Sequence, residues 1–227
     1  DHRDLHLSIR RQRQMCIRDS FFTGRKNNLA QWIDSPNFEI IRHDVTEPIL
    51  IEVDRIWHLA CPASPIHYQF NPIKTAKTSF LGTYNMLGMA KRVGAKFLLA
   101  STSEIYGKNE KIPWDEKADR VLGDPSVDRW CYSSSKALIE HMLFSLYRAK
   151  QLDFTTVRFF NVYGPKHLSI SKMSAVVGIF ENAYINKKPI PVVLPGTQTR
   201  RFTHVADTVQ TCLLYTSPRP RDLSTSR

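Results

Sequence analysis

Short apolar runs alternate with segments of helical periodicity along the middle of this 227-residue chain. We expect strands at 38–42, 55–60, 96–100 and 154–159, and helices at 77–93, 134–150 and 174–187. Such alternation favours an α/β fold, a Rossmann-like parallel sheet with helices on both faces. Ligands of these sheets lie at the carboxyl ends of the strands, which here carry Ala60, Ser101, Thr102 and Asn161.

A strand end rich in hydroxyl groups is followed, about thirty residues later, by a tyrosine and a lysine at helical spacing. Tyr132 and Lys136 are four residues apart, so on a helix the ammonium lies beside the phenol. A nearby cation lowers the pKa of a tyrosine, and we expect Tyr132 to act as general base for a sugar hydroxyl. The alternative is a surface tyrosine and lysine, which the hydroxyl-rich strand end disfavours.

Composition predicts a protein of the reducing cytoplasm. The chain is 42% hydrophobic, and no apolar run approaches the roughly 18 residues that span a membrane. The polar, arginine-rich first residues lack the apolar segment of a signal peptide. Four scattered cysteines show neither metal-ligand spacing nor a disulfide framework, so we expect no metal site.

The net charge of +11 raises the question of nucleic-acid binding. The basic residues are dispersed, and segments 1–20 and 213–227 each contribute +2 of the total. A basic groove for an anionic nucleotide-sugar is a better use of the remaining charge. We therefore expect neither a nucleic-acid partner nor a membrane partner.

Several segments resemble the extended short-chain dehydrogenase/reductase family, the NAD-dependent epimerases and dehydratases of nucleotide-sugars, and most of all its UDP-glucuronate decarboxylases. The similar segments are 21–26, 43–48, 58–65, 71–75, 85–94, 98–107, 158–165 and 196–202. The resemblance covers about residues 21–211 and is looser after Gly107. Decarboxylases usually read Tyr-Asp-Glu-Gly-Lys-Arg where this chain has 132–137, and 114–130 is more similar to epimerases or dehydratases. A divergent relative and two joined sequences would both give this pattern.

The resemblance also implies a domain organisation. Residues 21–165 would form a partial NAD-binding Rossmann domain, and 166–212 would begin a substrate-binding region. We interpret 1–20 and 213–227 as a leader and a tail that are non-native or disordered. Residues 1–20 contain no glycine, so the family's Gly-x-x-Gly-x-x-Gly turn is not found there. We interpret the first βα unit and most of the substrate domain as missing, and expect weak NAD binding and weak catalysis from these 227 residues.

Four catalytic residues are implied by the resemblance: Tyr132, Lys136, Thr102 and Glu104. Thr102 would hydrogen-bond the sugar 4-hydroxyl beside Tyr132. Glu104 discriminates within the family, because dehydratases usually carry Asp-Glu after the threonine, simple 4-epimerases lack the glutamate, and Ser-Glu is the decarboxylase pattern. The alternatives are a threonine that caps a turn and a solvated carboxylate.

The cofactor implied is NAD. Its predicted contacts come from the ends of successive strands and from the catalytic pair: Asp19, Phe22, Thr23, Gly24, Asp44, Val45, Leu59, Ala60, Cys61, Thr78, Ala100, Tyr132 and Lys136. Asp19 would hold the adenosine ribose, although it could match by accident. Asp44 could instead cap the following turn. Cys61 is interpreted as a small buried residue rather than a nucleophile.

The predicted contacts with the nucleotide-sugar substrate are more scattered: Ser103, Asn85, Lys91, Arg92, Asn161 and Arg200. Arg200 would meet anionic groups, for which a guanidinium is suited. Its alternative is a surface arginine, and Lys91 and Arg92 could be a solvated helix end.

The function implied is NAD-dependent decarboxylation of UDP-glucuronate to UDP-xylose through a 4-keto intermediate. A homodimer formed through a helix bundle that includes the Tyr132 helix is also implied. One alternative is a nucleotide-sugar 4-epimerase or 4,6-dehydratase of the same family. A second is a non-catalytic Rossmann-like binding module.

Overall fold

All strand pairings of the fold are parallel in the part that the structure describes. A computed structural model of the chain describes residues 15–22, 24–166 and 176–216. Strands β1 (Met15–Asp19) and β2 (Phe38–Arg42) pair with each other, and β3 (Arg55–His58), β4 (Lys96–Thr102) and β5 (Phe154–Phe159) form a three-stranded sheet. A third pair joins β6 (Asn161–Tyr163) and β7 (Phe202–His204). The predicted α/β class is confirmed.

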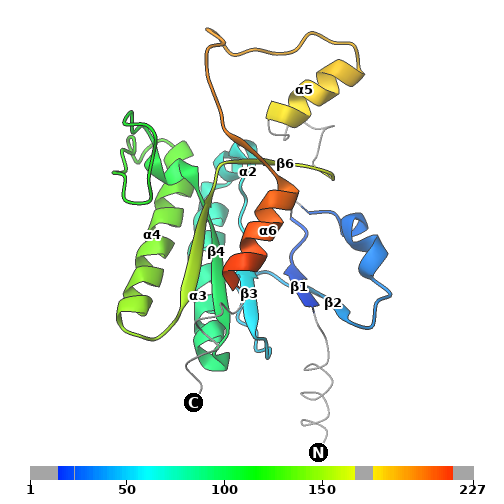
Figure 1. The fold of residues 1–227 in the computed structure, drawn as a ribbon, viewed down its shortest axis with the longest axis vertical. Coiled ribbons are helices and arrows are strands. Elements are labelled where there is room, and N and C mark those ends of the chain that lie inside the picture. Colours follow the sequence, from blue (N-terminus) through cyan, green and yellow to red (C-terminus); the bar gives the residue numbers. More distant parts are fainter. Residues whose placement is uncertain (1–14, 23, 167–175, 217–227) are drawn as a thin grey trace, which may run out of the picture.

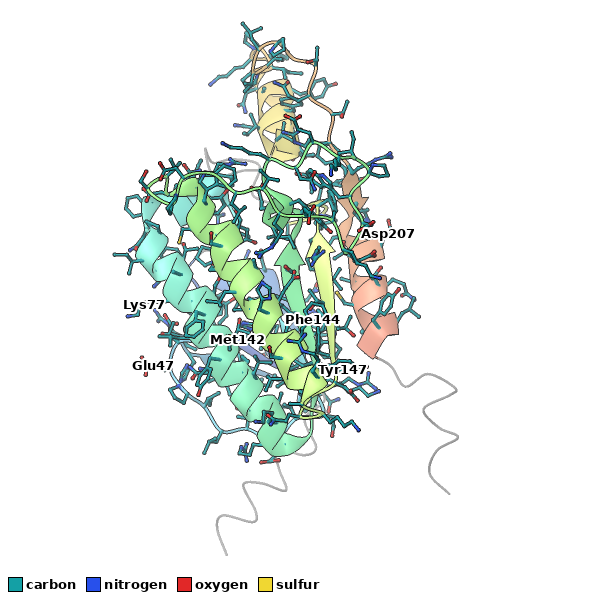
Figure 2. The ribbon with its side chains drawn as sticks, turned by 90° about the vertical axis from the view of Figure 1, so that its left-hand side faces the viewer. Glu47, Lys77, Met142, Phe144, Tyr147 and Asp207 are labelled. Carbon is teal, nitrogen blue, oxygen red and sulfur yellow. The ribbon has the colours of Figure 1, made fainter. Side chains whose placement is uncertain are left out.

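Helices cover the strands from two sides. The long helices α3 (Pro72–Val93) and α4 (Arg129–Arg148) lie side by side along the strands, and α6 (Val205–Thr216) lies on the other side (Figures 1 and 2). The shorter elements are η1 (Lys26–Trp32), α2 (Pro65–Phe70), η2 (Ser103–Tyr106) and α5 (Val176–Ile185). Within the described ranges, every helix is too short or too polar to cross a membrane.

The expected elements are present, and their ends differ for local reasons. The strands at 38–42 and 154–159 match the prediction residue for residue. Helix α3 begins five residues before its predicted start, because the Asn71 side chain accepts a hydrogen bond from the Lys74 N–H (2.9 Å) and Pro72 suits the first turn. It ends at Gly94, whose φ of 68° is the left-handed conformation that glycine adopts readily.

Strand β1 was not predicted, because a charged residue interrupts its apolar pattern. We placed no element before Phe21, yet residues 15–19 pair in register with β2. The Arg18 guanidinium within this strand contacts Nδ1 of His43 at 2.6 Å and donates to the Asp44 carbonyl at 2.9 Å. It also donates to the carbonyl of Glu47, so β1 is fastened to the loop after β2.

The main core lies between the central strands and the α3–α4 pair. Its buried side chains come from both layers: Ile56, Met86, Leu87, Met89, Ala90, Ala95, Phe97, Leu99, Ile139, Leu143 and Leu152. A smaller cluster of Ile105, Tyr106 and Ala137 packs beside the end of β4. These contacts place the start of α4 against the carboxyl end of β4, where the catalytic residues were predicted.

Two glycines of α3 provide a matched test of this packing. A Cβ at Gly82 would lie 2.6 Å from Cγ2 of Val45, whereas one at Gly88 would meet nothing within 4 Å. We expect Gly82→Ala to lower the free energy of unfolding by about 1–3 kcal/mol through overpacking. Gly88→Ala should raise it by about 0.5–1 kcal/mol, because alanine favours helix. Urea unfolding of both variants measures this, and an equal effect of the two would contradict the packing described.

Candidate active site

The predicted catalytic tyrosine, lysine and threonine meet at the carboxyl end of β4. The side chains of Tyr132 and Thr102 are hydrogen-bonded, and both are buried. One turn further along α4, Nζ of Lys136 donates to the Ala100 carbonyl at 2.8 Å and lies 5.9 Å from the centre of the Tyr132 ring. The structure therefore joins three of the four predicted catalytic side chains at one strand end.

The predicted acidification of Tyr132 is not what this structure gives. Burial raises the pKa of Tyr132 well above its usual range, and the neighbouring Cys61 and Glu104 raise it further. The hydrogen bond with Thr102 lowers the pKa but does not reverse the shift. Burial also lowers the pKa of Lys136. The physical reason is desolvation, because a buried phenolate loses its hydration and the ammonium is directed at Ala100.

A second tyrosine, which the sequence analysis missed, covers the ring of Tyr132. The ring of Tyr68, on α2, stacks on that of Tyr132 with centroids 4.9 Å apart and an angle of 4° between the planes. Only 1% of Tyr68 is exposed. Burial raises the pKa of the Tyr68 hydroxyl, Glu104 raises it further and Arg129 lowers it. The signal in the sequence is the position of Tyr68 just after a predicted strand end.

The fourth predicted catalytic residue, Glu104, lies in η2 directly after β4. Its N–H donates to Oγ1 of Thr102 at 3.1 Å, so Thr102 also caps the turn, as its alternative interpretation held. The Glu104 carboxylate accepts from Nη2 of Arg129 at 3.1 Å. Arg129 is the first residue of α4 and precedes Tyr132 by three positions, a helical spacing that could have identified it.

A cavity of about 140 Å³ lies at the ends of β1, β2 and β3. Eight of the predicted cofactor residues line it: Asp19, Phe22, Asp44, Val45, Leu59, Ala60, Cys61 and Thr78. Four lining residues were not predicted: Arg18, Ser20, Pro62 and Lys74. Cys61 is also an electrostatic neighbour of Tyr132 and Lys136, so this end of the cavity lies close to the catalytic group. Thr23 lies outside the described residues.

The carboxylates of this cavity suit the hydroxyl groups of a ribose. Asp19 accepts from the Phe21 N–H through Oδ1 (2.7 Å), which leaves Oδ2 directed towards Gly24. A Cβ at Gly24 would lie 3.3 Å from that oxygen, so glycine keeps the carboxylate accessible. Asp44 caps the following turn through the N–H and hydroxyl of Thr46, which lowers its pKa. The lining residues thus fit the adenosine part of NAD, with Asp44 also filling its alternative structural role.

Three of the predicted substrate contacts lie on α3, and their side chains bind other segments of the protein itself. Asn85 donates to the carbonyls of Val45 and Thr46 at 3.0 and 2.9 Å. Lys91 and Arg92 lie in the last turn of α3, where Nζ of Lys91 contacts Gln151 and Arg92 pairs with Glu52. Because α3 ends next to the start of β4, this turn lies at the amino end of the strands, away from Tyr132.

The remaining predicted substrate contacts follow β4 and β5. Ser103 begins η2 beside Thr102. Asn161, in β6, donates to the carbonyl of Arg201 at 2.9 Å, which ties it to the segment that carries Arg200. Arg200 is exposed and contacts the carbonyl of Thr199. The contacts that the structure describes for Asn161 and Arg200 do not join them to the catalytic group.

An ion pair between Glu140 and Arg158 supports the carboxyl end of β4. Glu140, one turn after Lys136, accepts from Nη2 of Arg158 at 2.6 Å and from the hydroxyl of Ser101. Nη1 of Arg158 donates to the hydroxyl of Tyr106 and to the carbonyl of Glu116, both at 2.8 Å. The network was not predicted, because its members are distant in sequence. It fastens the loop after η2 to β4, β5 and α4.

Two solved structures that are similar in fold are named as 4-epimerases of UDP-sugars. The chain is similar to the UDP-N-acetylglucosamine 4-epimerase of Methanobrevibacter ruminantium, with a TM-score of 0.78 and 25% identity, over 92% of this chain and 66% of that one. It is also similar in fold to the UDP-glucose 4-epimerase of Thermotoga maritima, with a TM-score of 0.75 and 24% identity, over 88% of this chain and 64% of that one.

The family follows from the sequence itself. The chain belongs to the GDP-mannose 4,6 dehydratase family, whose model matches residues 8–225. UDP-glucuronic acid decarboxylase 3 of Arabidopsis thaliana is 48% identical over 86% of this chain and 56% of its own length. UDP-glucuronic acid decarboxylase 1 of Xenopus tropicalis is 45% identical over 86% of this chain and 46% of its own length. The chain thus spans about half the length of these curated relatives.

The raised pKa of Tyr132 predicts a loss of stability at alkaline pH. Above about pH 10 a tyrosine of the unfolded chain releases its proton, whereas Tyr132 in the folded protein retains it. The free energy of unfolding must then fall as the pH rises through this range. We expect the fall to be smaller in Tyr132→Phe, as measured by urea unfolding at neutral and alkaline pH. Tyr184→Phe, on an exposed side chain of α5, is the control and should match the wild type.

Proposed function

We propose that the protein decarboxylates UDP-glucuronate to UDP-xylose through a 4-keto intermediate, with NAD as a recycled cofactor. The observation that carries this proposal is the meeting of Tyr132, Lys136 and Thr102 at the end of β4, with Glu104 directly after them. The identity of 45–48% with UDP-glucuronic acid decarboxylases supports the substrate.

Each residue of the group has a chemical role in this proposal. Thr102 would hold the sugar 4-hydroxyl against Tyr132. Tyr132 would first release its own proton, a form that the positive charges of Lys136 and of a bound NAD+ would favour, and the phenolate would then take the proton of that hydroxyl as C4 is oxidised. Bound NAD would supply the acceptor for the hydride of C4 and the donor for its return. Lys136 supplies positive charge close to the phenol, from its place on the Ala100 carbonyl. The 4-ketone is β to the C5 carboxylate, so the electrons released with CO2 are delocalised onto the ketone oxygen.

The cavity at the ends of β1 to β3 supports NAD as the cofactor. Asp19 and Asp44 would meet the hydroxyl groups and base of the adenosine, and Val45, Leu59 and Ala60 offer apolar contact. Thr78, on α3, lines the same cavity. Tyr132, Lys136 and Ala100 would hold the nicotinamide end, which Cys61 connects with the cavity.

A 4-epimerase or 4,6-dehydratase of the same family is the second candidate function. The fold similarity to two 4-epimerases supports it. Glu104 argues for the decarboxylase, because simple 4-epimerases resemble this chain at the threonine but lack the glutamate. The Ser103–Glu104 pair likewise differs from the Asp-Glu pair of dehydratases.

We further propose that two copies associate through the outer faces of α3 and α4. Aromatic and aliphatic side chains are exposed along both helices, among them Phe80, Tyr84, Leu138, Phe144 and Tyr147. Figure 2 shows Phe144 and Tyr147 on the side of α4 that faces β5, and both partly exposed rings also contact Phe154 at the start of β5. Exposed apolar surface on two adjacent helices favours a helix bundle between two copies.

Release of labelled CO2 from UDP-glucuronate tests the proposed reaction. We expect CO2 release by this chain to depend on NAD+ and to be slow, since NAD binding and catalysis are expected to be weak. Tyr132→Phe should lower kcat by about 10²–10⁴-fold, because the proton acceptor is removed. Tyr184→Phe is the control and should keep the wild-type rate. Conversion of UDP-glucose to UDP-galactose without CO2 release would favour the epimerase instead.

Charged substitutions on the helix pair test the association of two copies. We expect Leu138→Lys and Tyr84→Lys to convert a dimeric mass to a monomeric mass in light scattering, because a buried lysine without a partner opposes association. Tyr184→Lys, on α5, should remain dimeric. A monomeric wild-type protein at all concentrations would refute the proposal.

A further inference from the structure

An acidic side chain in η2 and a basic side chain at the start of α4 are in direct contact next to the candidate active site. Oε2 of Glu104 lies 3.1 Å from Nη2 of Arg129, and the side chains are 36% and 46% exposed. Glu104 raises the pKa of both Tyr68 and Tyr132, and Arg129 lowers the pKa of Tyr68. The pair therefore lies close to the stacked tyrosines and is partly exposed to solvent.

Charge balance at this position is a problem for the proposed substrate. The sugar of UDP-glucuronate carries a carboxylate on C5, next to the carbon that Tyr132 would serve. A second carboxylate, Glu104, follows Thr102 by two residues, and like charges at close range repel. An acidic sugar can bind there only if a cation offsets one of the two charges.

Arg129 is the cation in position to do so. Nζ of Lys136 is buried and directed at the Ala100 carbonyl. The guanidinium of Arg158 is engaged by Glu140 and Tyr106. Among the described residues, Arg129 is thus the cation that contacts Glu104, and its partial exposure leaves donors for a second oxyanion.

We propose that Arg129 determines specificity for an acidic sugar: it neutralises Glu104 and donates to the carboxylate of the incoming sugar. The proposal rests on the proposed function for the identity of that sugar. Epimerisation of a neutral hexose does not require this compensation. Arg129 would therefore separate acidic from neutral nucleotide-sugars at the binding step, before any bond is broken.

Calorimetric titration with UDP-glucuronate, UDP-glucose and UDP tests the proposal. We expect Arg129→Gln to weaken UDP-glucuronate binding about tenfold, and to change the binding of UDP-glucose and UDP by less than about twofold. The double variant Glu104→Gln with Arg129→Gln should recover most of the lost affinity, because both charges are then absent. Arg148→Gln, at the other end of α4, is the matched control and should behave as wild type.

The outcomes separate this inference from the proposed reaction. Equal weakening of UDP-glucuronate and UDP-glucose, or no recovery in the double variant, would mean that Arg129 only supports the structure. A wild-type chain without affinity for UDP-glucuronate would also overturn the inference. Selective loss and recovery without any CO2 release would refute the decarboxylase and uphold Arg129 as the residue that selects acidic sugars.

Discussion

The site depends on one stripe of α4 that is hydrogen-bonded to the end of β4. Tyr132, Lys136 and Glu140 follow one another at intervals of four, and their partners are Thr102, the Ala100 carbonyl and Ser101. All three side chains of the stripe are at least nine-tenths buried, so each bond is made where water cannot replace it. The helix therefore cannot slide along the strand without breaking three buried polar contacts together.

Two ion pairs near the end of β4 differ in their exposure to solvent: Glu140–Arg158 is largely buried, and Glu104–Arg129 is partly exposed. Glu140 is neutralised by Arg158, which also holds Tyr106 and the loop after η2. Breaking a buried pair by removing one partner is costly, so this end of the stripe is expected to be rigid. Glu104 and Arg129, by contrast, are partly exposed and lie close to the stacked tyrosines. A preorganised site needs such rigid supporting residues next to side chains that remain accessible to a ligand.

Regular patterns in the sequence predicted the fold and the Tyr132–Lys136 pair of the site. The strands at 38–42 and 154–159 and the Tyr132–Lys136 pair follow from periodicity, which depends only on local geometry. Strand β1 was not predicted because Arg18 interrupts its apolar pattern. The partners of the Arg18 guanidinium come from residues 43–47. The roles of Tyr68 and Arg158 were not predicted because their contacts join segments that are far apart in the chain. The pKa of Tyr132 was predicted in the wrong direction because burial cannot be read from spacing.

The stacked tyrosines have a consequence for how a substrate approaches. Tyr68 covers one face of the Tyr132 ring, and only 6% of Tyr132 is exposed. In the proposed reaction a sugar would therefore meet the phenol at its oxygen and not across its ring, which would restrict the angles at which a hydroxyl can be presented. Helix α2 thus covers one face of the phenol, and in the proposed reaction this cover, as much as the chemistry of the phenol, would decide which hydroxyl of a sugar is reached.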